Sequence, residues 1–274
     1  MDFFSKGQKI IRPQTRHQDK KMAKKNPPRK SVSVLVPVYN EEKTISEILN
    51  TLISLSFITE IVVVDDGSKD NTRAILEKVK NKKVRIYLQP RNQGKTAAIK
   101  RAIKEATCEI LVVQDADLEY DPYELESVLD PIWKGQADVV YGSRFLVKKA
   151  TRVLYYYHYI ANKFLTNFCN FFTNLNMTDI ETCYKAARAP IFKNLELTSK
   201  GFGMEVEITA MISRLPIRIY EVPISYYGRT YEEGKKIGMK DGIQALWYIV
   251  YFNLRSRLSS YRTYRKNVLD ELEG

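Results

Sequence analysis

Two carboxylates separated by one residue, Asp115 and Asp117, lie just after the apolar run of residues 110–113. A strand buried on both faces of a parallel sheet reads as continuous Val, Ile and Leu, and its carboxyl end is where open α/β sheets bind ligands. Two carboxylates held there repel each other unless a cation lies between them. Mg²⁺ and Mn²⁺ prefer oxygen ligands and share their coordination with substrate phosphates. The pair therefore predicts a site for a divalent ion and a phosphorylated substrate.

Two earlier segments have the same construction, an apolar strand that ends in acidic and turn residues. Residues 60–64 are followed by Asp65 and Asp66, and residues 32–36 are followed by a segment that contains Glu41. These segments predict two more buried strands whose ends carry polar side chains.

The connections between the strands have helical periodicity. Residues 44–55 and 71–79 each place apolar side chains on one face of a helix. Strand, helix, strand, helix at this spacing builds right-handed crossovers and a parallel sheet. The acidic strand ends then lie along one edge of the sheet, and we expect their carboxylates to converge there.

Six short segments carry motifs that follow one another in a recognisable order. They are Val36–Glu41, Val64–Ser68, Asn92–Lys95, Gln114–Leu118, Tyr141–Phe145 and Pro223–Arg229. Together they resemble the inverting family 2 glycosyltransferases of the GT-A fold, in particular the branch of dolichyl-phosphate mannose synthase and the polyprenyl-phosphate glucosyltransferases. The resemblance implies an α/β fold with a mostly parallel sheet flanked by helices. It also implies transfer of one sugar, glucose or mannose, from UDP-glucose or GDP-mannose to a polyprenyl or dolichyl phosphate.

The donor side of the site follows from this resemblance. Asp117 is the first expected ligand of Mg²⁺ or Mn²⁺, with Asp115 on the metal or the ribose and Glu119 as a further metal ligand. A metal that bridges diphosphate oxygens neutralises the leaving group. Lys95 begins the predicted helix 96–106, whose N-terminus suits an anion. The expected nucleotide contacts are Pro37, Tyr39, Glu41, Val64, Asp66 and Ala116.

The acceptor decides how much acid–base catalysis is needed. A hydroxyl acceptor must lose a proton and requires a carboxylate base. A lipid phosphate is mostly dianionic at pH 7 and needs cations to hold it. The resemblance assigns these cations to Arg144, Arg229 and Lys235. Asp179 is the expected base or phosphate-orienting residue, and Glu205 is the second choice.

The chain departs from the mannose synthases in two places. Residues 179–185 replace an Asp-Leu-Thr-Ser-Gly-Phe-Arg type segment, and residues 234–238 replace a Ser-Lys-Leu ending. The pattern of residues 227–238 looks more like that of UDP-sugar users. The donor sugar therefore stays open.

The length of 274 residues and the 44% hydrophobic content suit one α/β domain with appendages. The predicted parts are a basic tail (1–30), the glycosyltransferase domain (31–240) and a C-terminal helical extension (241–274). Cys108, Cys169 and Cys183 lack metal-binding spacing. An odd cysteine count without a signal peptide predicts reduced thiols in the cytoplasm.

The net charge of +12 is concentrated in the tail, where ten Lys or Arg stand against two Asp in residues 1–30. The tail lacks apolar periodicity and is predicted to be disordered. It acts either as a solvated extension or as a segment attracted to anionic lipid headgroups. The chain has no recognisable nucleic-acid module, so nucleic acid is not an expected partner.

No stretch approaches the roughly 20 apolar residues of a membrane span. Residues 154–172 and 243–252 nevertheless predict two aromatic-rich helices. These helices either pack on the sheet or a partner subunit, or lie in the membrane interface beside a lipid acceptor. We expect a peripheral enzyme at the cytoplasmic face of a membrane, with further contact supplied by an anchoring protein or a second copy.

Three functions compete at this point. The first is sugar transfer to a polyprenyl phosphate, and the second is the same donor chemistry aimed at a hydroxyl of a saccharide, polymer or small molecule. The third is a non-catalytic basic interaction protein built on the same fold. The intact Asp115, Asp117, Arg144 and Arg229 disfavour the third.

Overall fold

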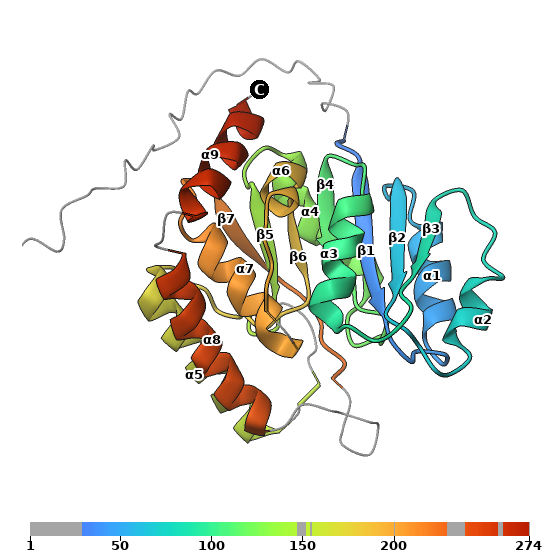
Figure 1. Cartoon of the computed structure of the whole chain (residues 1–274), viewed down its shortest axis with the longest axis horizontal. Coiled ribbons are helices and arrows are strands. Elements are labelled where there is room, and N and C mark those ends of the chain that lie inside the picture. The colour runs from blue at the N-terminus through green and yellow to red at the C-terminus, as the bar shows by residue number, and fades with distance from the viewer. Residues whose placement is uncertain are drawn as a thin grey trace, which may run out of the picture.

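The computed structural model describes residues 29–146, 152–153, 155–199, 201–228, 239–256 and 260–273. Within these residues, seven strands form one sheet in the order β3-β2-β1-β4-β6-β5-β7 (Figure 1). All neighbouring strands pair in parallel except β6, which runs antiparallel to both β4 and β5. The strands are β1 (Val32–Val38), β2 (Glu60–Asp65), β3 (Val84–Leu88), β4 (Ile110–Val113), β5 (Val139–Ser143), β6 (Lys185–Arg188) and β7 (Ile219–Pro223).

The three strands predicted from apolar runs are confirmed as β1, β2 and β4, and every residue in them is buried. The predicted α/β class and the mostly parallel sheet are confirmed as well. Strand β3 was not predicted, because it is an edge strand whose residues are half-buried or exposed and therefore has no continuous apolar run.

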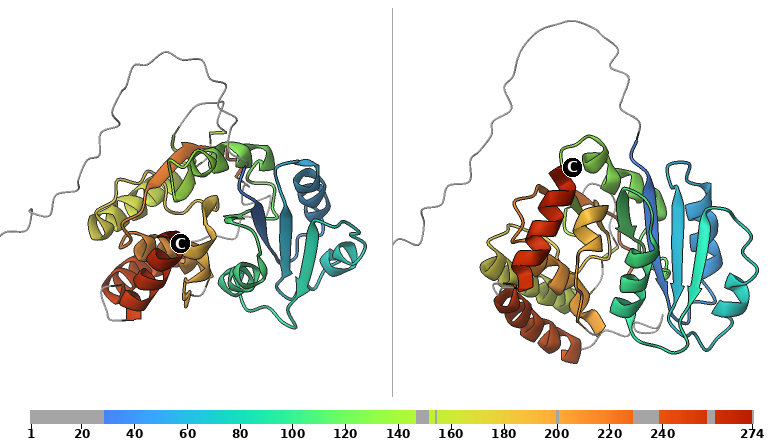
Figure 2. Two further views of the ribbon diagram at one scale, coloured as in Figure 1. Left: turned by 90° about the horizontal axis from the view of Figure 1, so that it is seen from above. Right: turned by 45° about the horizontal axis from the view of Figure 1, so that its top comes forward.

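Helices cover both faces of the sheet (Figure 2). Helices α1 (Ile45–Ser54) and α4 (Leu125–Trp133) lie on one face, where both contact the short helix η1 (Pro122–Glu124). Helices α3 (Lys95–Glu105) and α6 (Ala189–Lys193) contact each other on the opposite face. The remaining helix of the N-terminal half, α2 (Thr72–Leu76), is shorter than predicted and ends in single turns.

The C-terminal half adds helices beyond the sheet. Helix α7 (Met204–Ile212), preceded by η2 (Gly201–Gly203), contacts both α5 (Tyr156–Thr173) and α8 (Met239–Arg255), and those two helices contact each other. Helix α9 (Ser260–Glu273) packs on α6. The Tyr248 ring of α8 lies so close to Gly203 that a Cβ there would be 2.5 Å from it. The C-terminal helices are thereby fixed against the helix layer of the sheet.

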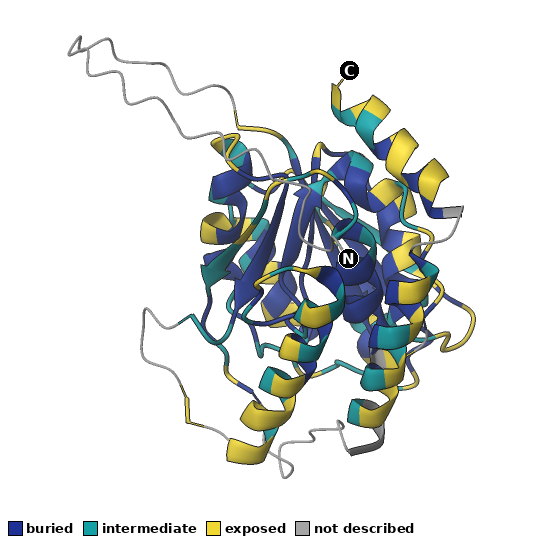
Figure 3. Cartoon of the chain, turned by 90° about the vertical axis from the view of Figure 1, so that its left-hand side faces the viewer, coloured by how far each residue is buried: buried dark blue, intermediate teal, exposed yellow. Residues whose placement is uncertain are grey.

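Helices α5 and α8 contain the two predicted aromatic segments and turn large side chains outward. Figure 3 views this side and shows exposed residues along both helices. Among the helices that the structure describes, none combines the length and the apolar character needed to cross a membrane. The exposed large side chains are Tyr156, Tyr157, Tyr159, Ile160, Phe164 and Phe171 on α5, and Ile243, Trp247, Tyr251 and Leu254 on α8.

The direction of β6 brings a new segment to the site. The carboxyl ends of the parallel strands β4 and β5 lie at the same edge of the sheet. Because β6 runs the other way between them, its first residue, Lys185, lies at that edge too. Residues 179–184 therefore approach the strand ends that carry Asp115 and Arg144.

Candidate active site

The loops after β1 and β2 are joined by reciprocal hydrogen bonds. The backbone N–H of Asn40 donates to Ser68 Oγ at 2.9 Å, and the Asn40 side-chain oxygen accepts from the backbone N–H of Lys69 at 2.8 Å. Asn40 has a φ of 54°, a left-handed conformation that Asn tolerates better than most residues. The backbone N–H of Glu41 donates to Thr72 Oγ1 at 2.9 Å. These bonds fix the loops that hold the predicted nucleoside residues.

Two buried carboxylates in this region are engaged by the protein itself. Asp65 accepts from the backbone N–H groups of Gly67 and Ser68 and forms an ion pair with Arg73 at 2.7 Å. Asp66 accepts from the backbone N–H groups of the loop before α3, at 2.8 Å from Gln93 and 2.7 Å from Gly94. The anion at the N-terminus of α3 is therefore the carboxylate of Asp66.

Glycine is required in the turn that follows. Gly67 has a φ of 75°, and a Cβ on it would lie 2.5 Å from the backbone of Arg91. Of the predicted nucleoside residues, Pro37 and Val64 are direct neighbours in the β1–β2 register. The strand ends thus bring Pro37, Val64 and Asp66 together, with Tyr39 and Glu41 in the adjoining loop, whereas Ala116 is buried beyond β4.

Lys95, the first residue of α3, joins two carboxylates from distant parts of the chain. Its Nζ lies 2.9 Å from Asp115 Oδ2 and 3.2 Å from Glu205 Oε1. Burial lowers the pKa of Lys95, but the charges of Asp115 and Glu205 more than offset this and raise it well above its usual value. Lys95 is therefore a fixed cation. Burial, followed by the charge of Asp115, raises the pKa of the neighbouring Cys183 thiol, which makes it an unreactive buried side chain.

The loop after β4 turns sharply at Leu118, whose φ is 61°. Within the turn, Asp117 Oδ1 accepts from the backbone N–H of Glu119 at 3.1 Å. Glu119 Oε2 accepts from the Tyr226 hydroxyl at 2.9 Å and so connects this loop to the segment after β7. A non-glycine residue with left-handed φ stores strain that the surrounding contacts must hold, which is common at ligand sites.

The chemistry of these side chains fits a metal that arrives with a diphosphate. Asp115, Asp117 and Glu119 offer only carboxylate oxygens, the ligand type that Mg²⁺ and Mn²⁺ prefer. Within the described ranges, no three His, Cys, Asp or Glu side chains form a group able to hold an ion by themselves. Mg²⁺ is commonly held by one or two carboxylates together with substrate phosphates, and the residues after β4 suit that mode.

Arg144, at the end of β5, forms a bidentate ion pair with Asp179. Arg144 Nε and Nη2 each lie 2.7 Å from an Asp179 oxygen, and the Arg144 backbone N–H adds a third bond at 3.1 Å. Asp179 is fully buried, whereas the Arg144 side chain keeps 12% exposure. Burial lowers the pKa of Arg144, but Asp179 more than offsets this and raises it well above its usual value. Arg144 is thus a fixed cation that is still reachable from solvent.

A third group of polar side chains joins Glu205, the second choice for the base, to Glu181 and Thr182, which the sequence gave no role. In the part of the chain that the structure describes, Glu181 Oε1, Thr182 Oγ1 and Glu205 Oε2 are buried without a hydrogen-bond partner. Lys185 is also buried and donates to the backbone carbonyls of Ile180 and Thr182. The departure of residues 179–185 from the mannose synthase pattern was the available signal for Glu181, Thr182 and Lys185. Arg229 and Lys235 lie outside the described residues, and their predicted roles stay predictions.

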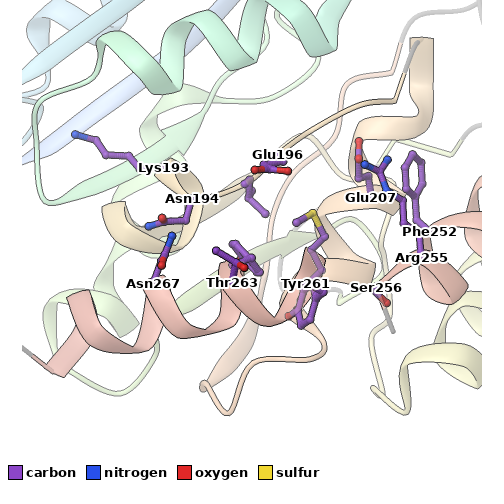
Figure 4. Close-up of a pocket in the computed structure, with 13 residues that line it drawn as sticks. Lys193, Asn194, Glu196, Glu207, Phe252, Arg255, Ser256, Tyr261, Thr263 and Asn267 are labelled. Carbon is purple, nitrogen blue, oxygen red and sulfur yellow. The ribbon is translucent and has the colours of Figure 1, made fainter. Parts of the chain in front are cut away.

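A separate pocket of about 240 Å³ lies between α6, α7, α8 and α9 (Figure 4). Its 13 lining residues include Lys193, Glu207, Arg255 and Tyr261. None of those residues is a predicted site residue, so this pocket is distinct from the carboxylate cluster at the strand ends.

The model of Glycosyl transferase family 2 matches residues 33–196, which is more than half of the chain. This chain belongs to glycosyl transferase family 2. The match includes β1 to β6 and hence Lys95, Asp115, Asp117, Arg144 and Asp179. The resemblance read from the six motifs is thereby confirmed.

Curated relatives extend over most of this family 2 chain. A dolichol-phosphate mannosyltransferase from Pyrococcus furiosus is 28% identical, over 76% of this chain and 59% of its own length. A polyprenol monophosphomannose synthase from Mycolicibacterium smegmatis is 25% identical, over 86% of this chain and 91% of its own. The glycosyltransferase AglJ of Haloferax volcanii is 28% identical, over 73% of this chain and 64% of its own. The chain thus spans less than two thirds of two of these relatives.

Solved structures support the fold. Glucosyl-3-phosphoglycerate synthase from Mycobacterium tuberculosis, crystallised with Mn²⁺, UDP-glucose and phosphoglyceric acid, superposes with a TM-score of 0.62. The alignment covers 83% of this family 2 chain and 79% of the synthase, at 19% identity. This similarity confirms the GT-A architecture that the motifs implied.

Proposed function

We infer that this chain transfers one hexose, glucose or mannose, from a nucleotide sugar to a polyprenyl phosphate, with inversion at the anomeric carbon. Family membership and the names of the mannosyltransferase relatives support this function. The observation that carries it is that two sites of opposite charge lie at one edge of the sheet. The carboxylates follow β4, and the fixed cation Arg144 follows β5. The first suits a metal-bound diphosphate and the second suits an anionic acceptor.

On the donor side, Asp117 would hold Mg²⁺ or Mn²⁺, with Asp115 and Glu119 as further oxygen ligands. When bound, the ion neutralises charge on the diphosphate leaving group. The solved synthase with Mn²⁺ and UDP-glucose supports a divalent ion and a UDP-sugar, whereas the mannosyltransferase relatives support GDP-mannose. Pro37, Tyr39, Glu41, Val64, Asp66 and Ala116 would contact the nucleotide, and Lys95 keeps Asp115 in place.

On the acceptor side, Arg144 would bind the lipid phosphate, assisted by Arg229 and Lys235. The planar guanidinium suits phosphate oxygens, and Asp179 orients it through two bonds. Both Asp179 oxygens already hold Arg144, so Asp179 serves as the orienting residue and not as a base. A phosphate acceptor fits this arrangement because it needs no deprotonation at pH 7.

The outward faces of α5 and α8 would place the enzyme at a membrane surface, where a lipid phosphate resides. Tyr and Trp favour the headgroup boundary, and amphipathic helices bind in that plane. The basic residues in positions 1–30 would add attraction to anionic lipid.

Vesicle binding tests this location. Trp247→Ser on α8 should weaken sedimentation of the protein with phosphatidylglycerol-containing vesicles several-fold. Tyr123→Ser in η1 is the matched control, because Tyr123 and Trp247 have nearly equal exposure, 64% and 63%. Equal binding by both variants and the unchanged protein would contradict the membrane assignment.

The reaction itself is tested with a donor panel and a short-chain polyprenyl phosphate. We expect one donor, UDP-glucose or GDP-mannose, to give a lipid-linked hexose of the corresponding mass that is labile in mild acid. NMR of the product from an α-linked donor should show a β linkage, because direct displacement with no enzyme nucleophile inverts the centre. Transfer to a sugar hydroxyl in preference to the lipid would replace this function with the alternative of a hydroxyl acceptor.

A further inference from the structure

Two carboxylates at the site each have one buried oxygen without a partner in the described part of the chain. Glu205 lies in the first turn of α7 and is 4% exposed, and Glu181 precedes β6. In the described part of the chain, Glu205 Oε2, Glu181 Oε1 and the hydroxyl of the fully buried Thr182 make no hydrogen bond. Buried polar atoms are nearly always hydrogen-bonded, because leaving one unsatisfied costs free energy. These three atoms therefore point to a missing ligand.

A neighbouring acid shows that this fold can satisfy such a group. Glu207 lies two residues further along α7 and is 1% exposed. Its oxygens accept from the backbone N–H groups of Thr198 and Ser199 and from the Thr198 hydroxyl, at 2.8 to 2.9 Å. Glu205 lies on the same helix, but within the described residues only its Oε1 has a partner, Lys95. Its Oε2 is therefore unsatisfied because of the surroundings that it faces and not because the helix buries it.

The surroundings define what the ligand must offer. Lys95 links Glu205 to Asp115, so the unsatisfied oxygen of Glu205 lies beside the predicted metal and diphosphate residues. The Lys185 ammonium donates to the carbonyls of Ile180 and Thr182, and its charge still acts on both glutamates. A phosphate would be repelled by two carboxylates. Neutral hydroxyl groups can donate to carboxylate oxygens and both donate to and accept from a threonine hydroxyl.

We propose that Glu205 and Glu181, with Thr182, form the subsite that recognises the hydroxyl groups of the donor's sugar. The inference rests on the proposed function and adds its specificity-determining residues. The sugar lies between Asp115 on the diphosphate side and Arg144 on the acceptor side, and the two glutamates hold its hydroxyls. Burial and then the charge of Glu205 raise the pKa of Glu181. Such a shift is expected where the fold holds two acids close together for a ligand.

The test compares binding of the nucleotide alone with binding of the nucleotide sugar. Calorimetry of the full chain with Mn²⁺ gives the dissociation constants of UDP and UDP-glucose, or of GDP and GDP-mannose if guanine is preferred. Glu205→Gln and Glu181→Gln should weaken the nucleotide sugar by roughly 10- to 100-fold and leave the nucleotide nearly unchanged, because a glutamine oxygen at position 205 can still accept from Lys95 while the carboxylate contacts with the sugar are lost. Glu207→Gln is the matched control. In this variant, the ratio of the dissociation constant of the nucleotide to that of the nucleotide sugar should equal the ratio for the unchanged chain.

Deoxy-sugar donors sharpen the result. The donor that lacks the recognised hydroxyl should bind the unchanged chain and the Glu205→Gln variant equally, because the pair that the substitution breaks is already absent. Glu205→Asp, which keeps a charge for Lys95, provides a second variant if Glu205→Gln does not fold. The inference would be overturned if the Glu205 and Glu181 variants bind the nucleotide and none of them changes the ratio of the two dissociation constants. Failure of the unchanged chain to bind either nucleotide would instead overturn the proposed function.

Discussion

The carboxylates after β2 and those near β6 and α7 all have buried oxygens, but they differ in their partners. Asp65 and Asp66 accept hydrogen bonds from the backbone of their own and the neighbouring loop. Glu181 and Glu205 each have an oxygen that nothing in the described part of the chain satisfies. Both groups lie at the same edge of one sheet, so their position in the fold does not explain the difference.

The difference separates structure from binding. A carboxylate satisfied by backbone N–H groups shapes a loop, and its loss costs stability. A buried carboxylate with an unsatisfied oxygen lowers stability until a ligand arrives, as is common at functional sites. Substitutions in the first group should therefore affect folding, in addition to the nucleotide contact proposed for Asp66, and substitutions in the second group should affect ligands. A substitution of Asp117, which is predicted to bind the metal, should likewise affect ligands more than folding.

The largest effect is expected for Asp117→Asn. Loss of a metal ligand should lower the transfer rate by roughly 100- to 1,000-fold, because the ion contributes several kcal/mol to charge stabilisation. The melting temperature should stay near that of the unchanged chain. EDTA should abolish activity, and added Mn²⁺ or Mg²⁺ should restore it. Full activity in excess chelator would refute the metal assignment.

Asp66→Asn should mainly reduce stability. The amide keeps one acceptor for the N–H groups of Gln93 and Gly94 and turns an N–H donor toward the other. We expect a loss of about 2 to 3 kcal/mol in the free energy of unfolding, measured by urea denaturation. Asp130→Asn removes an exposed ion pair with Lys134 and is the control, with an expected change within about 0.5 kcal/mol. Equal changes in the free energy of unfolding of the two variants would show that Asp66 does not stabilise the fold in the way proposed.

The smallest effect is expected for Glu181→Gln, which should raise the free energy of unfolding where Asp66→Asn lowers it. Burial and the charge of Glu205 raise the pKa of Glu181 to about 7 in the folded chain, against 4.5 as its ordinary value. The folded state then binds more protons between these values, so this group makes stability fall as pH rises from about 4.5 to about 7. Other charged groups that act on it are Lys185, Arg144 and Asp179.

Glu181→Gln should remove this fall and stabilise the chain at pH 8 by about 1 kcal/mol. Scanning calorimetry between pH 5 and 8 measures it. Glu207→Gln, at a satisfied acid, should destabilise at every pH. A Glu181→Gln variant that is less stable than the unchanged chain at pH 8 would show that Glu181 is satisfied after all.

The sequence alone determined the frame of the site. Continuous apolar runs marked β1, β2 and β4, because a strand covered on both faces must be apolar throughout. The polar residues that follow these runs, Asp66 and Asp115 among them, had to meet at one edge once the sheet was parallel. Six ordered motifs added the family. Strands β3, β5, β6 and β7 were not predicted. Strand β3 is a half-buried edge strand, and β6 has only four residues, Lys185–Arg188, without an apolar run.

Only the tertiary structure decided which charges meet. Lys95 and Glu205 are 110 residues apart, and Arg144 and Asp179 are brought into contact by a strand that enters the sheet in reverse. Spacing along the chain has no information on such pairs, because they depend on how α3, α7 and β6 pack. The same packing satisfies Glu207 and leaves an oxygen of Glu205 unsatisfied, although the two acids share a helix turn. Whether a buried acid serves structure or ligand is set by the donors that the fold brings to it.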